Sequence, residues 1–185
     1  MIRLETERLI LRGFRLTDTP ALYKYASRPD IGPACGWLPH VNRVETFFVI
    51  LTMRKIPYTW ALVEKKSRKL IGTIDLVIGQ SAHEKLPDSQ GEIGYWLAHE
   101  WRHQGYMKEA AERVLRFAFE DRTLQRVWAL RFTDNEDSLK LMQSLGMRYD
   151  HTNYGRWWPA LRVKKDEDAC VLTKTMWREN HELLP

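Results

Sequence analysis

The feature that most constrains this chain is a short apolar run that leads through a glycine-containing turn into an amphipathic helix. The run begins at Glu92 and continues as Ile93-Gly94-Tyr95-Trp96-Leu97-Ala98, a length and composition typical of a buried strand. Downstream, apolar residues recur at three- and four-residue steps, as in a helix that buries one face. These residues are Met107, Ala110, Ala111, Val114 and Ala118.

Charged residues on this helix pattern are spaced to form ion pairs on its exposed face. Glu109 precedes Arg113 by four positions, and Glu112 precedes Arg116 by the same interval. Residues four apart are neighbours on a helix surface, so both pairs are expected to form there.

The turn between strand and helix has the composition of an anion-binding site. It reads Arg102-His103-Gln104-Gly105-Tyr106-Met107. A glycine lets the backbone approach a ligand closely, and the first turn of a helix offers unpaired N–H groups and a positive dipole end. The sequence therefore predicts that this turn holds an anionic group.

Composition indicates one globular domain, residues 1–185. With 44% hydrophobic and 29% charged residues, the chain can bury a full core. The net charge of +5 is compatible with an anionic cofactor, but basic and acidic residues are interleaved along the chain. Direct nucleic-acid binding is therefore not indicated.

Cysteine usage and hydropathy point to a cytoplasmic protein. Cys35 and Cys170 are the two cysteines and form no C-x-x-C pattern, so neither a disulfide framework nor a thiolate metal site is expected. The first residues, 1–8, are charged, which argues against a signal peptide. No apolar run approaches the length of a membrane span, so no membrane association is expected.

The remaining pattern alternates strands and helices. Strands are expected at 9–14, 58–64, 69–78, 126–132, 147–154 and 169–175, and helices at 21–26 and 45–53. Thr17 or Asp18 is expected to cap the first helix, ahead of Pro20. The segment 30–42 is an apolar loop that contains Trp37, which we interpret either as the wall of a substrate site or as core filling. Trp157-Trp158-Pro159 is interpreted as a substrate lid, a homodimer contact or packing over the sheet end.

A second pattern follows the strand at 126–132. Asn135 is placed to cap a helix, and Gly146 suits its left-handed C-terminal position. At helical spacing, Ser138, Met142 and Leu145 share one face, which directs the Ser138 hydroxyl inward. The alternative is that this hydroxyl bonds to its own backbone near the helix start.

His99-Glu100-Trp101-Arg102-His103 also matches H-E-x-x-H, the zinc-peptidase pattern. That pattern requires one helix through both histidines. Because a strand is expected to end near Ala98 and Gly105 follows closely, such a helix is not expected here. We therefore predict no metal site, and the peptidase remains a remote alternative.

The run W-R-H-Q-G-Y-M-K-E-A after the strand E-I-G-Y-W-L resembles the acetyl-coenzyme A signature of the GNAT superfamily of N-acetyltransferases. Its R-x-x-G-x-G/A pattern is matched except at Met107, where the superfamily prefers Gly or Ala. The closest match of this run is the branch of the ribosomal-protein alanine acetyltransferases RimJ and RimL, and the N-terminal T-E-R-L-I-L-R resembles the opening of that branch. The segment from Asn135 to Met147 resembles the GNAT segment N-x-x-S/A-x-x-L-x-x-x-x-G-F. Together these matches cover most of the chain.

The resemblance implies an α/β GNAT fold, with a mixed, mainly antiparallel sheet that splays between its central strands, 92–98 and 126–132, and is flanked by helices. It implies acetyl-CoA as co-substrate and no metal. The residues that it assigns to the cofactor are Leu97, Ala98, Arg102, Gln104, Gly105, Tyr106, Met107, Lys108, Asn135 and Ser138.

The resemblance also implies direct acetyl transfer to a primary amine. Many GNAT enzymes carry a tyrosine acid seven residues after the asparagine, but Met142 stands there, so Ser138 is the matching candidate for assisting thiolate departure. A base must take the amine proton; Glu92 is the first candidate and Asp75 the second, and either carboxylate has a structural alternative. Asp75 and Trp37 are the candidates for substrate binding, and a backbone N–H within 95–98 is expected to bind the oxyanion.

The acceptor amine stays open between a protein N-terminus and a small molecule such as an aminoglycoside or polyamine. A non-catalytic acyl-CoA-binding or ribosome-associated module is an alternative of another class.

Overall fold

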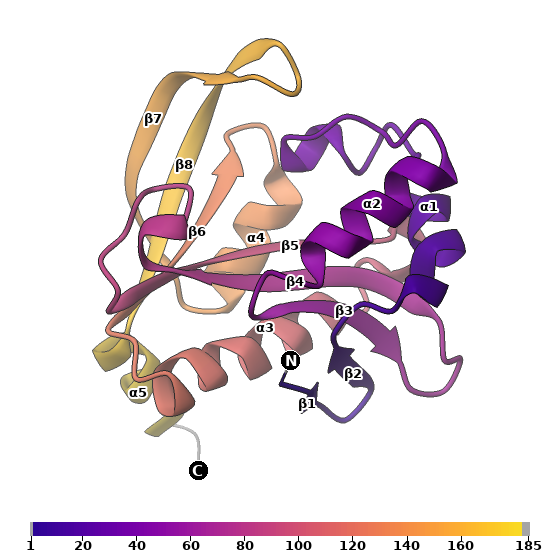
Figure 1. Cartoon of the computed structure of the whole chain (residues 1–185). Helices are drawn as coiled ribbons and strands as arrows, with labels where there is room; N and C mark the ends of the chain where they lie inside the picture. The colour runs from indigo at the N-terminus through magenta and orange to yellow at the C-terminus, as the bar shows by residue number, and fades with distance from the viewer. Residues whose placement is uncertain (1, 183–185) are drawn as a thin grey trace. The chain divides into compact units, whose positions relative to one another are not determined.

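The computed structural model describes residues 2–182 and alternates strands with helices (Figure 1). The strands are β1 (Leu4–Glu5), β2 (Leu9–Arg12), β3 (Thr59–Glu64), β4 (Leu70–Ile78), β5 (Gln90–Leu97), β6 (Arg126–Phe132), β7 (Arg148–Trp158) and β8 (Val163–Thr173). The α-helices are α1 (Thr19–Ala26), α2 (Arg43–Met53), α3 (Tyr106–Arg116), α4 (Glu136–Ser144) and α5 (Lys174–Glu182). None of the helices in this range is long and apolar enough to cross a membrane.

The strands form a mixed, mainly antiparallel sheet in the order β1-β2-β3-β4-β5-β6-β8-β7. β1 with β2, β2 with β3, β3 with β4, and β6 with β8 are antiparallel pairs. β5 and β6 are parallel, with a register that runs from Gln90 opposite Arg126 to Glu92 opposite Trp128. β6 continues beyond this register with β8 as its partner, as far as Phe132 opposite Glu167. The expected mixed, mainly antiparallel sheet is therefore confirmed.

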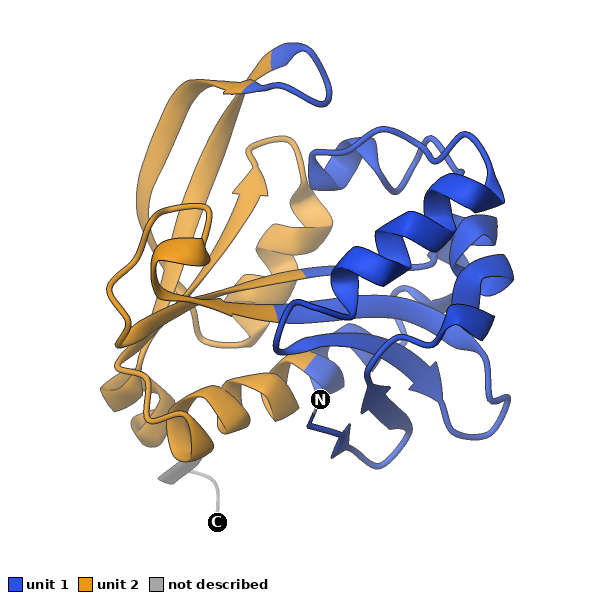
Figure 2. Cartoon of the chain, in the orientation of Figure 1, with its two compact units in different colours: residues 1–75, 95–110, 158–163 blue, residues 76–94, 111–157, 164–185 orange. Residues whose placement is uncertain are grey.

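The chain divides into two compact units, which are described separately (Figure 2). Unit 1 comprises residues 1–75, 95–110 and 158–163, and unit 2 comprises 76–94, 111–157 and 164–185. The expectation of a single domain stays a prediction.

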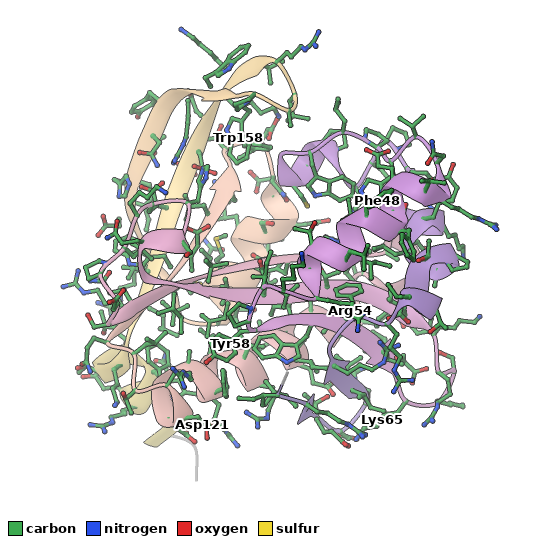
Figure 3. All side chains as sticks on the ribbon, viewed as in Figure 1. Phe48, Arg54, Tyr58, Lys65, Asp121 and Trp158 are labelled. Atoms are coloured by element: carbon green, nitrogen blue, oxygen red, sulfur yellow. The ribbon has the colours of Figure 1, made fainter. Side chains whose placement is uncertain are left out.

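The core of unit 1 is formed where α1 and α2 pack on the sheet. Leu22 and Tyr25 of α1, Ile50 of α2, Ala61 of β3 and Trp96 of β5 are buried in one cluster. Burial of such side chains stabilises the folded chain by about 1.5–3 kcal/mol each. The opposite side of α2 is exposed: Figure 3 labels Phe48, whose side chain is 60% exposed.

The predicted apolar face of α3 is buried along its length, from Met107 through Ala110 and Val114. One expected ion pair is wrong. Glu109 was assigned to an exposed pair with Arg113, but its carboxylate is mostly buried and pairs with Arg8 instead. The helix forms as expected, but Arg8, between β1 and β2, binds the Glu109 carboxylate.

Three other expectations need correction. Asp18 precedes α1 but makes no capping bond, because its carboxylate accepts hydrogen bonds from Arg12 and from the Arg15 backbone. β7 extends to Trp158 and β8 begins at Val163, so the segment expected to connect the strands is largely part of them. The helix α5, Lys174–Glu182, was not predicted.

Gly72 of β4 predicts a measurable cost of adding one methyl group. A Cβ there would run into the carbonyl oxygen of Trp96 and lie 3.2 Å from the Leu97 Cα, both backbone atoms of β5. Gly72→Ala should therefore lower the free energy of unfolding by about 1–3 kcal/mol in urea titrations, the usual cost of overpacking. Lys69→Ala, an exposed change next to the same strand, should stay within about 0.5 kcal/mol. Equal stability of the two variants would contradict this account of the β4–β5 contact.

Candidate active site

The turn from β5 to α3 has an irregular backbone with two left-handed residues. His99, Glu100 and Trp101 form a single 3₁₀ turn. His103 then has a φ of 58° and Gly105 a φ of 80°, after which α3 begins at Tyr106. The single helix through both histidines that H-E-x-x-H requires is therefore not formed.

The turn leaves open space at Gly105, the position predicted to approach an anion. A Cβ on Gly105 would meet one atom within 4 Å, the Nη2 of Arg8 at 3.4 Å. Glu109 N–H donates to the Gly105 carbonyl at 3.0 Å, which starts the hydrogen bonding of α3. The preceding N–H groups have no carbonyl one turn earlier within the helix, as at any helix start. An anionic group fits this arrangement of open backbone and positive helix end.

Met107, the departure from the superfamily pattern, lies with its side chain in the core and is 8% exposed. It therefore contributes only backbone at the turn. Arg102 Nε donates to the Leu97 carbonyl at 3.1 Å, and Gln104 Nε2 donates to the Glu100 carbonyl at 3.0 Å. Both predicted cofactor residues thus use side-chain groups to hold the turn.

The expected oxyanion donor lies within 95–98. One N–H of this stretch is used in the structure: that of Ala98 donates to the Ile71 carbonyl at 2.8 Å.

Trp37 lies in unit 1 and packs partly against the core. Its ring lies against Gly32 and has its centroid 5.3 Å from that of His40. The core-filling interpretation of Trp37 is therefore at least partly correct. Trp158, labelled in Figure 3, packs on Gly36 of the same loop. Residues after Trp37 place apolar side chains in solvent: Leu38, Val41, Val44 and Phe48.

Asp75, the second candidate base, lies on β4 opposite Thr59 and is half-buried. Cys35 lies in the same unit, where burial raises the pKa of its thiol to about 11, with a smaller upward effect of Asp75 and an opposing effect of Arg102.

The second motif forms as predicted in unit 2. The Asn135 side chain accepts a hydrogen bond from the Ser138 N–H at 3.1 Å and caps α4, and Gly146 has a φ of 75°. Met142 and Leu145 are buried on the expected face. Within residues 2–182, no hydrogen bond joins the Ser138 hydroxyl to another group, so the capping bond proposed as its alternative role is absent.

Arg131 is a residue of this region that sequence reasoning missed. It is 9% exposed, and its Nη1 donates to the carbonyls of Phe132, Thr133 and Asn135 at 3.3, 2.9 and 3.2 Å. Its Nη2 donates to Asp168 at 2.6 Å. A buried cation of this kind fixes the turn that carries Asn135 into α4. A charge within an otherwise apolar strand pattern was the available signal.

Glu92, the first candidate base, lies half-buried on β5 in unit 2. Its carboxylate accepts a hydrogen bond from the Glu84 N–H at 3.4 Å, which is a structural role of the kind expected as its alternative. The Glu84 carboxylate in turn accepts hydrogen bonds from Asn153 and Arg156. Glu92 thus belongs to the polar surroundings of the loop between β4 and β5.

Glu167 of β8 is a second missed residue. Its side chain is buried, and Arg156 Nη1 donates to it at 3.1 Å. Burial and the Glu84 charge raise its pKa to about 7 against the opposing effect of Arg156. A carboxyl with such a pKa can exchange a proton at neutral pH.

His83, Glu84 and Glu167 form the group of potential metal ligands found among residues 2–182. Arg156 donates hydrogen bonds to both carboxylates. Its guanidinium offsets part of the negative charge of these two carboxylates.

Comparison with known proteins identifies the class. Residues 8–148 match the family model described as the acetyltransferase (GNAT) domain. The chain is 29% identical over 151 residues to YoaA of Bacillus subtilis (strain 168), described as an uncharacterized N-acetyltransferase, which covers 78% of this chain and 82% of YoaA. The protein therefore belongs to the GNAT acetyltransferase family and is an N-acetyltransferase, and membership implies the use of acetyl-CoA.

Solved structures show the same fold. A putative acetyltransferase from T. thermophilus aligns with a TM-score of 0.81 at 21% identity, covering 99% of this chain and 97% of that one. A ribosomal-protein-S5-alanine acetyltransferase from Vibrio fischeri aligns with a TM-score of 0.75 at 20% identity, covering 96% of this chain and 99% of that one. The resemblance to the RimJ-type branch is confirmed at the level of fold.

Glu167 predicts a pH-dependent stability. Its pKa in the folded chain, about 7, lies above the ordinary value of 4.5, so the folded chain retains a proton that the unfolded chain releases. Ionisation therefore lowers stability progressively as pH rises between these values, with the full effect above pH 7. Glu167→Gln should raise the melting temperature relative to the parent at pH 8 but not at pH 4. The same shift at both pH values would show that Glu167 does not titrate in this way.

Proposed function

We propose that this protein transfers the acetyl group of acetyl-CoA directly to a primary amine, either the N-terminus of a polypeptide or a small molecule. The observation that carries the proposal is the turn at Gly105, where open, left-handed backbone lies at the N-terminus of α3 directly after β5. This arrangement suits a pyrophosphate, because backbone N–H groups and the helix dipole both favour an anion.

We expect separate groups of residues to bind the pyrophosphate and the pantetheine arm of the cofactor. Gln104, Gly105, Tyr106, Met107 and Lys108 offer backbone N–H groups to the pyrophosphate, and Arg102 keeps the turn attached to β5. Leu97 and Ala98 line the path of the pantetheine arm with backbone. Asn135, at the start of α4 in unit 2, stays a predicted cofactor residue.

The acceptor amine must lose a proton before or during its attack on the thioester. Glu92 is proposed as the base, acting through water, and Asp75 is the second candidate. Loss of the high-pH plateau in the kcat/KM profile of only one of the variants Glu92→Gln and Asp75→Asn would identify the base.

The exposed apolar residues after Trp37 support a polypeptide as acceptor, since exposed apolar surface marks contact with protein partners. The test is an acetyl-transfer screen over peptides that begin with Ala or Ser, aminoglycosides and polyamines. Turnover with peptides alone would support the polypeptide, and turnover with small amines alone would assign the alternative. Binding of acetyl-CoA without turnover of any amine would contradict the proposal. A homodimer stays a prediction.

Gly105→Val should weaken acetyl-CoA binding by more than about tenfold in calorimetry, because a β-branched side chain would occupy the open space and strain a left-handed backbone. Gly155→Val is the matched control. Gly155 is also left-handed, with a φ of 59°, but has no atom near its Cβ position and lies in the β7–β8 hairpin. If folded Gly105→Val protein keeps the parent's affinity for acetyl-CoA, the pyrophosphate does not bind at this turn.

Ser138→Ala should lower kcat about ten- to a hundredfold with little change in acetyl-CoA affinity. The Ser138 hydroxyl is proposed to donate a hydrogen bond to the developing thiolate, and a bond to a charged group contributes about 1.5–3 kcal/mol. Ser144→Ala is the control on the same helix, since the Ser144 hydroxyl donates to the Leu141 carbonyl at 2.8 Å, one turn earlier. Full kcat in Ser138→Ala would leave solvent as the proton source.

A further inference from the structure

Arg8 of the T-E-R-L sequence, residues 6–9, contacts the turn at Gly105 just before β2 begins at Leu9. The Arg8 side chain makes three contacts with the turn and with the start of α3. Its Nε donates to Glu109 Oε2 at 2.6 Å, and its Nη1 donates to the Gln104 carbonyl at 3.0 Å. Its guanidinium lies 4.3 Å from the centre of the Tyr106 ring. The contacts thus fall on both sides of Gly105.

Both carboxylate oxygens of Glu109 accept hydrogen bonds from this segment. Oε1 accepts from the Thr6 hydroxyl at 2.5 Å and from the Arg8 N–H at 2.8 Å, while Oε2 takes the Arg8 side chain. Burial alone would raise the pKa of this carboxyl, but these hydrogen bonds and the Arg8 charge lower it overall. Glu109 is therefore ionised at neutral pH and forms charge-assisted hydrogen bonds, which are stronger than neutral ones.

The turn needs such support because its own backbone is unfavourable. A non-glycine residue in the left-handed region costs about 1–2 kcal/mol, and His103 is such a residue. Strained residues of this kind persist only where surrounding contacts determine them. Arg8 supplies one of these contacts from outside the turn, by holding the Gln104 carbonyl between the two left-handed residues.

An arginine suits this position better than a lysine. The planar guanidinium directs Nε to Glu109 and Nη1 to Gln104 while its face lies on Tyr106, three contacts that a single ammonium group cannot reproduce together. The Nη2 of Arg8 lies beside Gly105, so the same group also bounds the open space there.

We propose that Arg8 is a positioning residue that holds the Gln104–Tyr106 backbone ready for the pyrophosphate of acetyl-CoA, with Glu109 as its anchor. The inference rests on the proposed placement of the cofactor at Gly105. It assigns a role to the N-terminal T-E-R-L motif, and it makes the affinity for the nucleotide half of the cofactor depend on a residue about a hundred positions away in sequence.

The test compares two acyl donors, acetyl-CoA and S-acetyl-pantetheine, which lacks the pyrophosphate and nucleotide. Arg8→Ala should raise the KM for acetyl-CoA about ten- to a hundredfold, because the turn would no longer be held in the conformation that binds the charged pyrophosphate. The kcat should change less than about threefold, because the loss affects cofactor binding and not the chemical step. Its kcat/KM with S-acetyl-pantetheine should match that of the parent within about twofold. Arg8→Lys should resemble Arg8→Ala. Glu109→Gln should likewise lower kcat/KM more with acetyl-CoA than with S-acetyl-pantetheine.

The matched control is Arg3→Ala. Arg3 forms a 2.6 Å ion pair with Glu5 at the same end of the chain, but both side chains are largely exposed. It should change neither donor's kinetics. An equal loss of kcat/KM with both donors in Arg8→Ala would make Arg8 a general structural residue. An unchanged KM for acetyl-CoA would show that Arg8 has no role in cofactor binding. Either result overturns the inference about Arg8 but leaves the proposed function standing. If the parent protein itself binds no acetyl-CoA, the proposed function fails as well.

Discussion

The candidate site depends on a short stretch of backbone that no regular secondary structure holds. Between the end of β5 and the start of α3, the chain passes through two left-handed residues within three positions, His103 and Gly105. Two backbone hydrogen bonds close its 3₁₀ turn, from the Trp101 N–H to Ala98 and from the Arg102 N–H to His99. Three more come from side chains: Arg102 to Leu97, Gln104 to Glu100 and Arg8 to Gln104. Because each of these side chains donates to a backbone carbonyl, none of them uses an N–H group of the turn. This is the arrangement that an anion-binding turn requires.

In unit 2, an arginine side chain likewise holds the backbone that leads to Asn135 at the start of α4. Arg131 lies in a buried strand and donates to the carbonyls of Phe132, Thr133 and Asn135, while Asp168 neutralises its charge. Thr152 donates to the other Asp168 oxygen at 2.7 Å, which ties β7 into the same network. In both units, an arginine that no catalytic signature includes fixes the backbone beside a signature residue. Bonds from charged groups are suited to this role because they are strong and directional.

Sequence reasoning succeeded where the decisive contacts are local. β5, Gly105 and α3 follow one another directly, and Asn135 caps a helix three residues from its partner Ser138. It failed where the contacts are distant. Arg8 and Glu109 are 101 positions apart, so helix spacing assigned Glu109 to Arg113. The helix α5 is mostly polar, and its Trp177 stacks on Phe119 with ring centroids 5.6 Å apart, a tertiary contact without a local signal. β7 is largely exposed and showed no alternation by which its length could be recognised.

The surroundings of Cys35 have a practical consequence for enzymology. Burial raises the pKa of this thiol to about 11, and burial also raises the pKa of Cys170. At pH 8 only about one Cys35 in a thousand carries the reactive thiolate form. Disulfide reagents that detect the free thiol of coenzyme A should therefore report product release with little background from the protein. Turnover can then be followed continuously with the unmodified chain, and neither cysteine needs to be replaced.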